Sequence, residues 1–176
     1  RRSLLSSAPI CSSSCFTLLV RRRFSASSLA RSSFGSSVSR NRLIRPTTRA
    51  AALFDELILA VYDRPQKNLL FTVEERVALA SEALRGVPNV RVASYSGLTV
   101  DFVRSVGSQV IVRGLRAVTD FELEYQTAMT NQQLAPEVEI ICLMTSLQRT
   151  YISSTVVKDV ARGGGSLDQF VPPCVA

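Results

Sequence analysis

Histidine is absent from this chain of 176 residues, and that absence excludes several kinds of active site. Without it, the polypeptide alone cannot form a metalloprotease zinc helix, a histidine-dependent serine or cysteine triad, or a histidine general acid or base. A P-loop is also lacking. The three glycines at 163–165 follow an expected helix instead of a strand, which is the wrong context for a dinucleotide-binding fingerprint.

Acidic residues are absent from the first 54 positions, which contain 10 arginines. The rest of the chain carries 11 basic and 14 acidic side chains, so the net charge of +7 comes from the N-terminal segment alone. The remaining part is therefore mildly acidic, and we expect no nucleic-acid partner.

The N-terminal segment is rich in serine and arginine and has only a short apolar run at 15–20, far below membrane-spanning length. This composition is typical of an organelle transit peptide, for a mitochondrion or a plastid, and we expect no membrane partner. The alternative is a wrongly joined gene segment, in which case the protein is cytoplasmic. We predict a transit-like or disordered leader over residues 1–48, dispensable for one α/β domain over residues 49–176.

Four cysteines, Cys11, Cys15, Cys142 and Cys174, show no paired spacing. They predict neither a disulfide framework nor a metal site. Because Cys142 falls inside the apolar run 138–144, we expect a small buried side chain there.

The part of the chain after Asp55 alternates short apolar runs with helical patterns. The runs 57–62, 90–93, 109–112 and 138–144 each fit a strand, and most are apolar on both faces, as a buried parallel sheet requires. This order predicts an α/β fold: a Rossmann-like parallel sheet with helices on both faces and ligands at the C-terminal edge of the strands.

Capping signals mark the expected helices. Thr72 and Glu75 form a capping box for a helix that runs to Gly86, and Thr119 with Glu122 predicts a second box for a helix that ends near residue 134. A shorter helix spans 99–106, and the last helix is capped by Ser153 or Ser154 and ends at residue 163.

Polar residues that could bind phosphate follow the strands. Arg113 and Arg116 flank a glycine directly after the strand 109–112, and a charge-assisted arginine contact is worth about 1.5–3 kcal/mol. Lys67 follows the strand 57–62, and the hydroxyls of residues 153–155 open the last helix. Surface arginines, a solvated lysine and ordinary helix capping are the alternatives, but the convergence of all three at one edge favours a phosphate-rich ligand.

Three segments carry a resemblance to a known family: FTVEER at 71–76, RGLRAVTDFE at 113–122 and YISSTVVK at 151–158. In order and spacing they resemble bacterial-type pantetheine-phosphate adenylyltransferases, of the nucleotidyltransferase α/β superfamily, over about residues 49–172. The resemblance implies transfer of an adenylyl group from ATP to 4′-phosphopantetheine in coenzyme A biosynthesis, with Mg²⁺, in a homo-oligomer that is a hexamer in the family.

The resemblance also implies roles for individual residues. The substrate phosphopantetheine would be bound by Lys67, Thr99 and Arg113. Thr99 stands where the family more often has an apolar residue. Glu124 could reach the ribose of the nucleotide or organise Arg116. The expected ATP-binding residues are Gly114, Leu115, Arg116, Glu124, Arg149, Thr150, Tyr151, Ile152, Ser153, Ser154 and Thr155.

The sequence departs from the family pattern before residue 49. The family places a threonine and a histidine for catalysis in a first strand-loop-helix, whereas this region reads here as leader sequence. We therefore expect the first strand, loop and helix to be missing, the neighbouring strand edge to be exposed, and adenylyl transfer to be impaired. No catalytic residue and no metal ligand is identified. The alternatives are a non-catalytic homologue that binds phosphate ligands or assists assembly, and a cytidylyl- or nicotinamide-mononucleotide adenylyltransferase.

Overall fold

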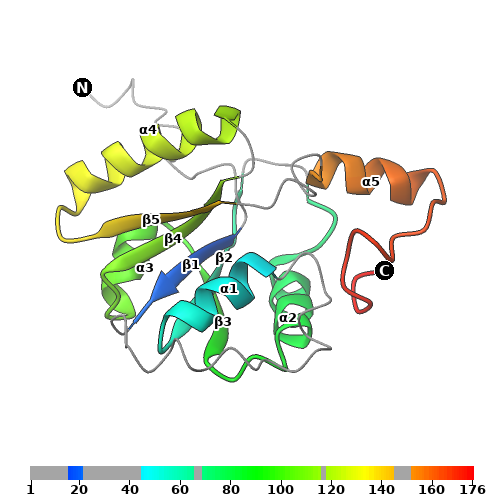
Figure 1. Ribbon diagram of the computed structural model, residues 1–176, viewed down its shortest axis with the longest axis horizontal. Helices are drawn as coiled ribbons and strands as arrows, with labels where there is room; N and C mark the ends of the chain where they lie inside the picture. The colour runs from blue at the N-terminus through cyan, green and yellow to red at the C-terminus, as the bar shows by residue number, and fades with distance from the viewer. Residues whose placement is uncertain (1–15, 22–44, 66–68, 116–117, 145–151) are drawn as a thin grey trace, which may run out of the picture.

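A computed structural model of the protein describes residues 16–21, 45–65, 69–115, 118–144 and 152–176. Its centre is a five-stranded sheet in the order β3-β2-β1-β4-β5 (Figure 1). Pairing is parallel between β2 and β3 and between β4 and β5, whereas β1 runs antiparallel to both of its neighbours. The strands are β1 (Phe16–Val20), β2 (Leu57–Tyr62), β3 (Val90–Tyr95), β4 (Val110–Leu115) and β5 (Glu139–Met144). The predicted α/β class is confirmed, with a mixed and mostly parallel sheet.

Helices alternate with the strands, as predicted. They are α1 (Arg45–Leu53), α2 (Val73–Ala83), α3 (Thr99–Ser105), α4 (Val118–Leu134) and α5 (Ser154–Arg162). The first predicted capping box is confirmed, because the Glu75 amide donates to the Thr72 hydroxyl over 3.2 Å and the Thr72 amide donates to the Glu75 carboxylate over 2.8 Å. The second is wrong: α4 begins at Val118, so Thr119 lies inside the helix and not at its N-cap.

The N-terminal segment contributes the central strand, which corrects the expectation that residues 1–48 lie outside the α/β core. Leu19 is fully buried in β1, and its strand pairs with β2 over its whole length. A central strand is covered on both faces and needs apolar side chains on both, which Leu18, Leu19 and Val20 supply. The first helix also begins at Arg45, four residues before the expected boundary. The centre of the sheet is therefore filled, and the expected exposed edge beside β2 is not present.

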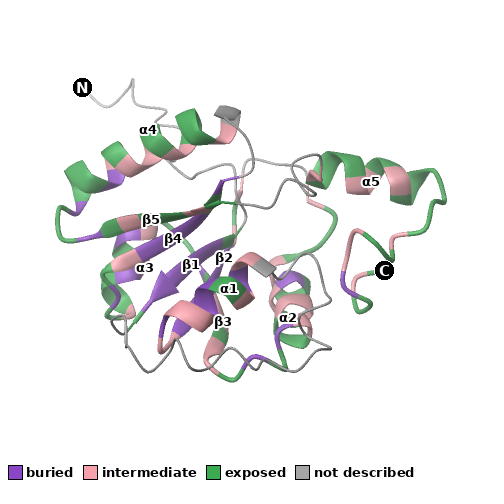
Figure 2. Cartoon of the chain, viewed as in Figure 1, coloured by how far each residue is buried: buried purple, intermediate pink, exposed green. Residues whose placement is uncertain are grey.

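Two layers of apolar side chains lie on opposite faces of the sheet. Alternate residues of the strands point to opposite faces, so Leu18 and Val112 pack with α1 and α2, and Leu19 and Ile111 pack with α3. Figure 2 shows the buried residues concentrated in β1, β2 and β4, with α5 largely exposed. The core is thus built around the strand that comes from the N-terminal segment.

The edge strand β5 is more exposed than its sequence predicts. Cys142 is an exposed free thiol and Met144 is 67% exposed, so the expectation of a small buried cysteine is wrong. The reason is that β5 pairs with one neighbour only, β4, and lies at the margin of the sheet. Within the described ranges, no helix is both long enough and apolar enough to cross a membrane.

Candidate substrate-binding site

The site is centred on Arg113, near the C-terminal end of β4. Its side chain is 6% exposed and forms a two-pronged ion pair with Glu124 of α4, with Nε 2.8 Å from Oε2 and Nη2 3.0 Å from Oε1. Parallel double contacts of this kind hold a guanidinium in a defined plane. Glu124 was expected to reach the ribose or organise Arg116; in the structure its described contact is with Arg113.

The remaining nitrogen of the Arg113 guanidinium, Nη1, contacts β1. Nη1 donates to the Thr17 hydroxyl over 2.9 Å and to the Phe16 carbonyl oxygen over 3.4 Å. This contact follows from the register: Leu18 pairs with Val112, so Thr17 and Arg113 are the next residues along the two strands and share a face. Two elements far apart in sequence therefore hold one cation.

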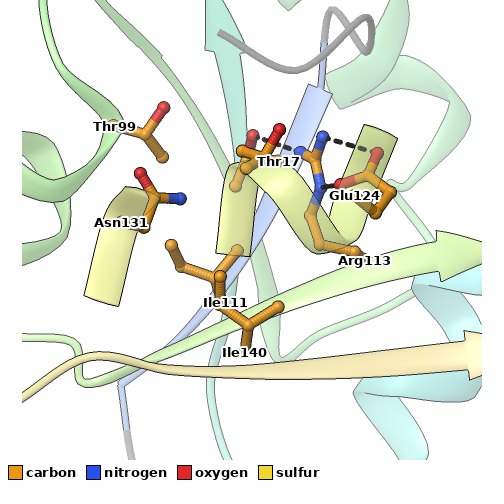
Figure 3. A pocket seen from close by; sticks show the side chains of 8 residues that line it. Thr17, Thr99, Ile111, Arg113, Glu124, Asn131 and Ile140 are labelled. Atoms are coloured by element: carbon orange, nitrogen blue, oxygen red, sulfur yellow. Dashed lines mark hydrogen bonds and ion pairs between the residues drawn. The ribbon is translucent and has the colours of Figure 1, made fainter. Parts of the chain in front are cut away.

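A small pocket lies on this face of the sheet, between β4, α3 and α4 (Figure 3). Its floor is apolar, formed by Ile111 and Ile140. Its polar wall consists of Thr17, Thr99, Arg113, Glu124, Thr127 and Asn131. The pocket thus combines one buried ion pair with a small apolar floor.

Two of these wall residues carry a spacing signal that sequence reasoning missed. Thr127 and Asn131 follow Glu124 at steps of three and four residues, so they lie on the same face of α4. That stripe was readable from the sequence. Thr17 carried no such signal, because it lies in the segment interpreted as a leader.

The other expected substrate- and ATP-binding residues are distributed as follows. Thr99 is the first residue of α3, and its hydroxyl lies 3.0 Å from the Tyr95 hydroxyl. Gly114 and Leu115 are still part of β4, which continues past the predicted end at residue 112. A Cβ at Gly114 would meet no atom within 4 Å, so the space beside this glycine is open.

The start of α5 lies outside the lining of the pocket. Ser153 is its N-cap, and the Val156 amide donates to the Ser153 hydroxyl over 3.2 Å. Ser154 and Thr155 are exposed in the first turn, and Ile152 is half-buried. Lys67, Arg116, Arg149, Thr150 and Tyr151 lie outside the described residues.

The Cys142 thiol is affected by its surroundings. Although the residue is exposed overall, partial burial of the thiol raises its pKa, the Glu124 carboxylate raises it further, and the Arg113 guanidinium lowers it. Burial disfavours the charged thiolate, and a neighbouring negative charge acts in the same direction. The thiol is therefore a weaker nucleophile at neutral pH than an ordinary cysteine.

The described part of this site has no cluster of carboxylates that could bind a metal ion. Among the residues that the structure describes, no group of three or more Asp, Glu, Cys or His side chains could hold one. Glu124 is paired with Arg113. The described side chains thus do not form a Mg²⁺ cage, and Mg²⁺ commonly keeps several waters and binds through substrate phosphates.

Comparison with known proteins places the chain in a family. Residues 44–160 match the cytidylyltransferase-like family. A phosphopantetheine adenylyltransferase from Roseiflexus sp. (strain RS-1) is 54% identical over 124 residues, which is 70% of this chain and 78% of that protein. A second, from Thermomicrobium roseum, is 53% identical over 131 residues, which is 73% of this chain and 78% of that protein.

The chain belongs to the phosphopantetheine adenylyltransferase family. This is the family, also called pantetheine-phosphate adenylyltransferase, that the three sequence segments resemble, so the predicted relationship is confirmed. The matched residues begin just before α1 and end within α5. The central strand β1 lies outside them, so the Thr17 contact to Arg113 is made by a part of the chain that the family match does not cover.

Proposed function

We propose that the protein transfers an adenylyl group from ATP to 4′-phosphopantetheine, giving dephospho-coenzyme A and pyrophosphate. Membership of the phosphopantetheine adenylyltransferase family is the observation that carries this proposal. The position of Arg113 at the ligand edge of the sheet supports it, because the acceptor carries a phosphate.

The reaction joins a phosphate oxygen of phosphopantetheine to the α-phosphorus of ATP. The bond from that phosphorus to the oxygen that bridges to the β-phosphate breaks, and pyrophosphate leaves with the electron pair. Such transfers depend on in-line placement and charge stabilisation more than on covalent help. The guanidinium of Arg113, held in its plane by Glu124, is suited to place the acceptor phosphate.

The residue roles are proposed from the resemblance. Lys67, Thr99 and Arg113 would bind phosphopantetheine. The backbone at Gly114 and Leu115, with Arg116, Glu124 and residues 149–155, would bind ATP. Mg²⁺ would arrive with the phosphates of ATP, because the described side chains form no cage for it.

Transfer by this chain is expected to be slow. The chain contains no histidine, so it lacks the side chain that, by the resemblance, the family aims at the α-phosphate. Losing a single transition-state donor costs on the order of 10² to 10³ in rate. In addition, β1 runs antiparallel to β2 and β4, so it enters the ligand edge of the sheet with its N-terminal end.

A homo-oligomer, a hexamer by resemblance, fits the exposed surface of α4. Five large apolar side chains of this helix are more than 40% exposed, and the rings of Phe121 and Tyr125 stack with centroids 5.9 Å apart. Such surfaces on soluble domains commonly mark contact sites. The five are Phe121, Leu123, Tyr125, Met129 and Leu134.

The location proposed from composition is an organelle, a mitochondrion or a plastid, with the cytoplasm as the alternative. The arginine run at 21–23 resembles a presequence cleavage site, yet it follows the last residue of β1 directly. Cleavage there would separate β1 from the rest of the sheet. We therefore propose that the mature protein is not cut at the arginine run and retains this strand. We propose no nucleic-acid or membrane partner, because the excess of basic over acidic residues is confined to the N-terminal part of the chain.

The competing function is that of a non-catalytic homologue that binds phosphate ligands, which the absence of histidine favours. Calorimetry with ATP and with phosphopantetheine measures binding, and phosphopantetheine-dependent pyrophosphate release measures transfer. Binding of both ligands with slow release supports the enzyme. Binding with no release above the rate without protein supports the homologue, and failure to bind either ligand refutes both.

A further inference from the structure

Thr17 occupies an unusual position for a residue of an arginine-rich N-terminal segment. It lies in the central strand, is 3% exposed, and lines the pocket between α3 and α4. Its hydroxyl accepts from Arg113 Nη1 over 2.9 Å (Figure 3). The segment interpreted from composition as a leader thus contacts the cation at the centre of the candidate site.

The contact completes the orientation of the guanidinium. Glu124 binds the edge formed by Nε and Nη2, which leaves Nη1 directed toward β1. A threonine hydroxyl can accept one hydrogen bond and still donate another. Its χ1 angle is stiff because the side chain is β-branched, and its backbone is held in a strand paired on both sides. Thr17 therefore presents a fixed acceptor to Arg113.

We propose that Thr17 is a positioning residue for the phosphate of the substrate and acts through Arg113. This proposal rests on the proposed function, because it takes phosphopantetheine as the ligand whose phosphate Arg113 meets. Glu124 holds the guanidinium along one edge, and Thr17 adds a contact at Nη1 that helps to keep the whole planar group in one orientation. Loss of the Thr17 hydroxyl leaves Nη1 with the 3.4 Å contact to the Phe16 carbonyl, so the planar guanidinium as a whole is held less firmly and phosphate affinity falls while contacts to the pantetheine arm persist.

A purely structural role for Thr17 makes a different prediction. Removing a buried hydroxyl that only stabilises the fold would weaken the binding of every ligand of the pocket to the same degree. The informative quantity is therefore the ratio of affinities for 4′-phosphopantetheine and for pantetheine, which differ by the phosphate alone. This ratio isolates the effect of Arg113 from general damage to the sheet.

The experiment measures both ligands by calorimetry on the full 176-residue chain and three variants. Thr17→Val keeps the shape of the side chain and removes the hydroxyl, and Thr17→Ser restores it. Ser108→Ala is the matched control: the Ser108 hydroxyl is also buried and donates to β1, at the Val20 carbonyl over 2.5 Å, but at the opposite end of the strand.

Thr17→Val should lower the affinity ratio about tenfold, the size expected for a hydrogen bond to a charged group. Thr17→Ser should stay within about twofold of the parent, and Ser108→Ala should leave the ratio unchanged even if it lowers the melting temperature. An unchanged ratio in Thr17→Val, or an equal fall in Thr17→Ser, overturns the proposal.

Two further outcomes are distinguishable. If Thr17→Val does not fold, Thr17→Cys, whose thiol is a weaker acceptor of similar size, must lower the ratio, and an unchanged ratio there overturns the proposal. If the parent chain binds phosphopantetheine no more tightly than pantetheine, the phosphate does not contribute to binding. This result refutes the proposed function itself, before any variant is compared.

Discussion

Replacing Leu19 by alanine is the sharpest test of the central strand. Leu19 is fully buried, and the residues paired with it on the two neighbouring strands are Ile58 and Ile111, both also buried. Burying a leucine side chain stabilises a fold by about 1.5–3 kcal/mol, and leucine-to-alanine changes in cores cost about 2–5 kcal/mol once the cavity is included. Because this site is enclosed by paired strands and cannot collapse easily, we expect about 3–5 kcal/mol.

The assay is urea unfolding followed by circular dichroism, with the free energy of unfolding compared between the parent and Leu19→Ala. The same loss should lower the melting temperature by about 6–20 °C for a domain of this size. Leu70→Ala is the matched control, because Leu70 is 60% exposed and the change in chemistry is identical. We expect the control to cost less than about 0.5 kcal/mol.

A loss below about 1 kcal/mol for Leu19→Ala would refute the assignment of β1 to the core. It would return residues 16–20 to the role of a dispensable leader. Deleting residues 1–21 is the complementary test, since it would expose the facing edges of β2 and β4, and unpaired strand edges promote association. A deleted chain that unfolds at the same urea concentration as the parent and stays monodisperse would contradict the structure in the same way.

Three further predictions concern the site. Arg113→Ala and Arg116→Ala should each weaken ATP or phosphopantetheine binding about tenfold or more, with parent binding sensitive to salt; unchanged affinities by calorimetry would show that there is no arginine clamp. The given chain should release pyrophosphate at least about 10² times more slowly than a chimera with a bacterial first strand-loop-helix, and equal rates would show that the histidine is not needed. Because burial and the Glu124 carboxylate raise the pKa of Cys142, its alkylation by iodoacetamide should reach half its maximal rate at a higher pH than that of a free cysteine. Peptide mass spectrometry measures this, and a midpoint at or below that of free cysteine would contradict it.

The sequence predicted most of the local structure from residue 57 onward. The apolar run at 57–62 is β2 with the predicted bounds, and the Thr72 capping box and the Ser153 cap are in place. These features depend on contacts between residues a few positions apart, or on a continuous apolar run, so a single sequence displays them. The family was also readable, because its motifs are short contiguous segments.

The tertiary structure alone decided the centre of the sheet and the contacts of the cation. A run of five residues, Phe16–Val20, becomes a core strand only by pairing with segments about 40 and 90 positions away, and its serine- and arginine-rich surroundings hide that role. Likewise, the contacts of Arg113 with Glu124 and Thr17 join three elements, and no local periodicity encodes them. What the chain alone determines is which residues can form strands, helices and caps; which strand lies beside which, and hence which side chains meet, is set by long-range pairing and burial.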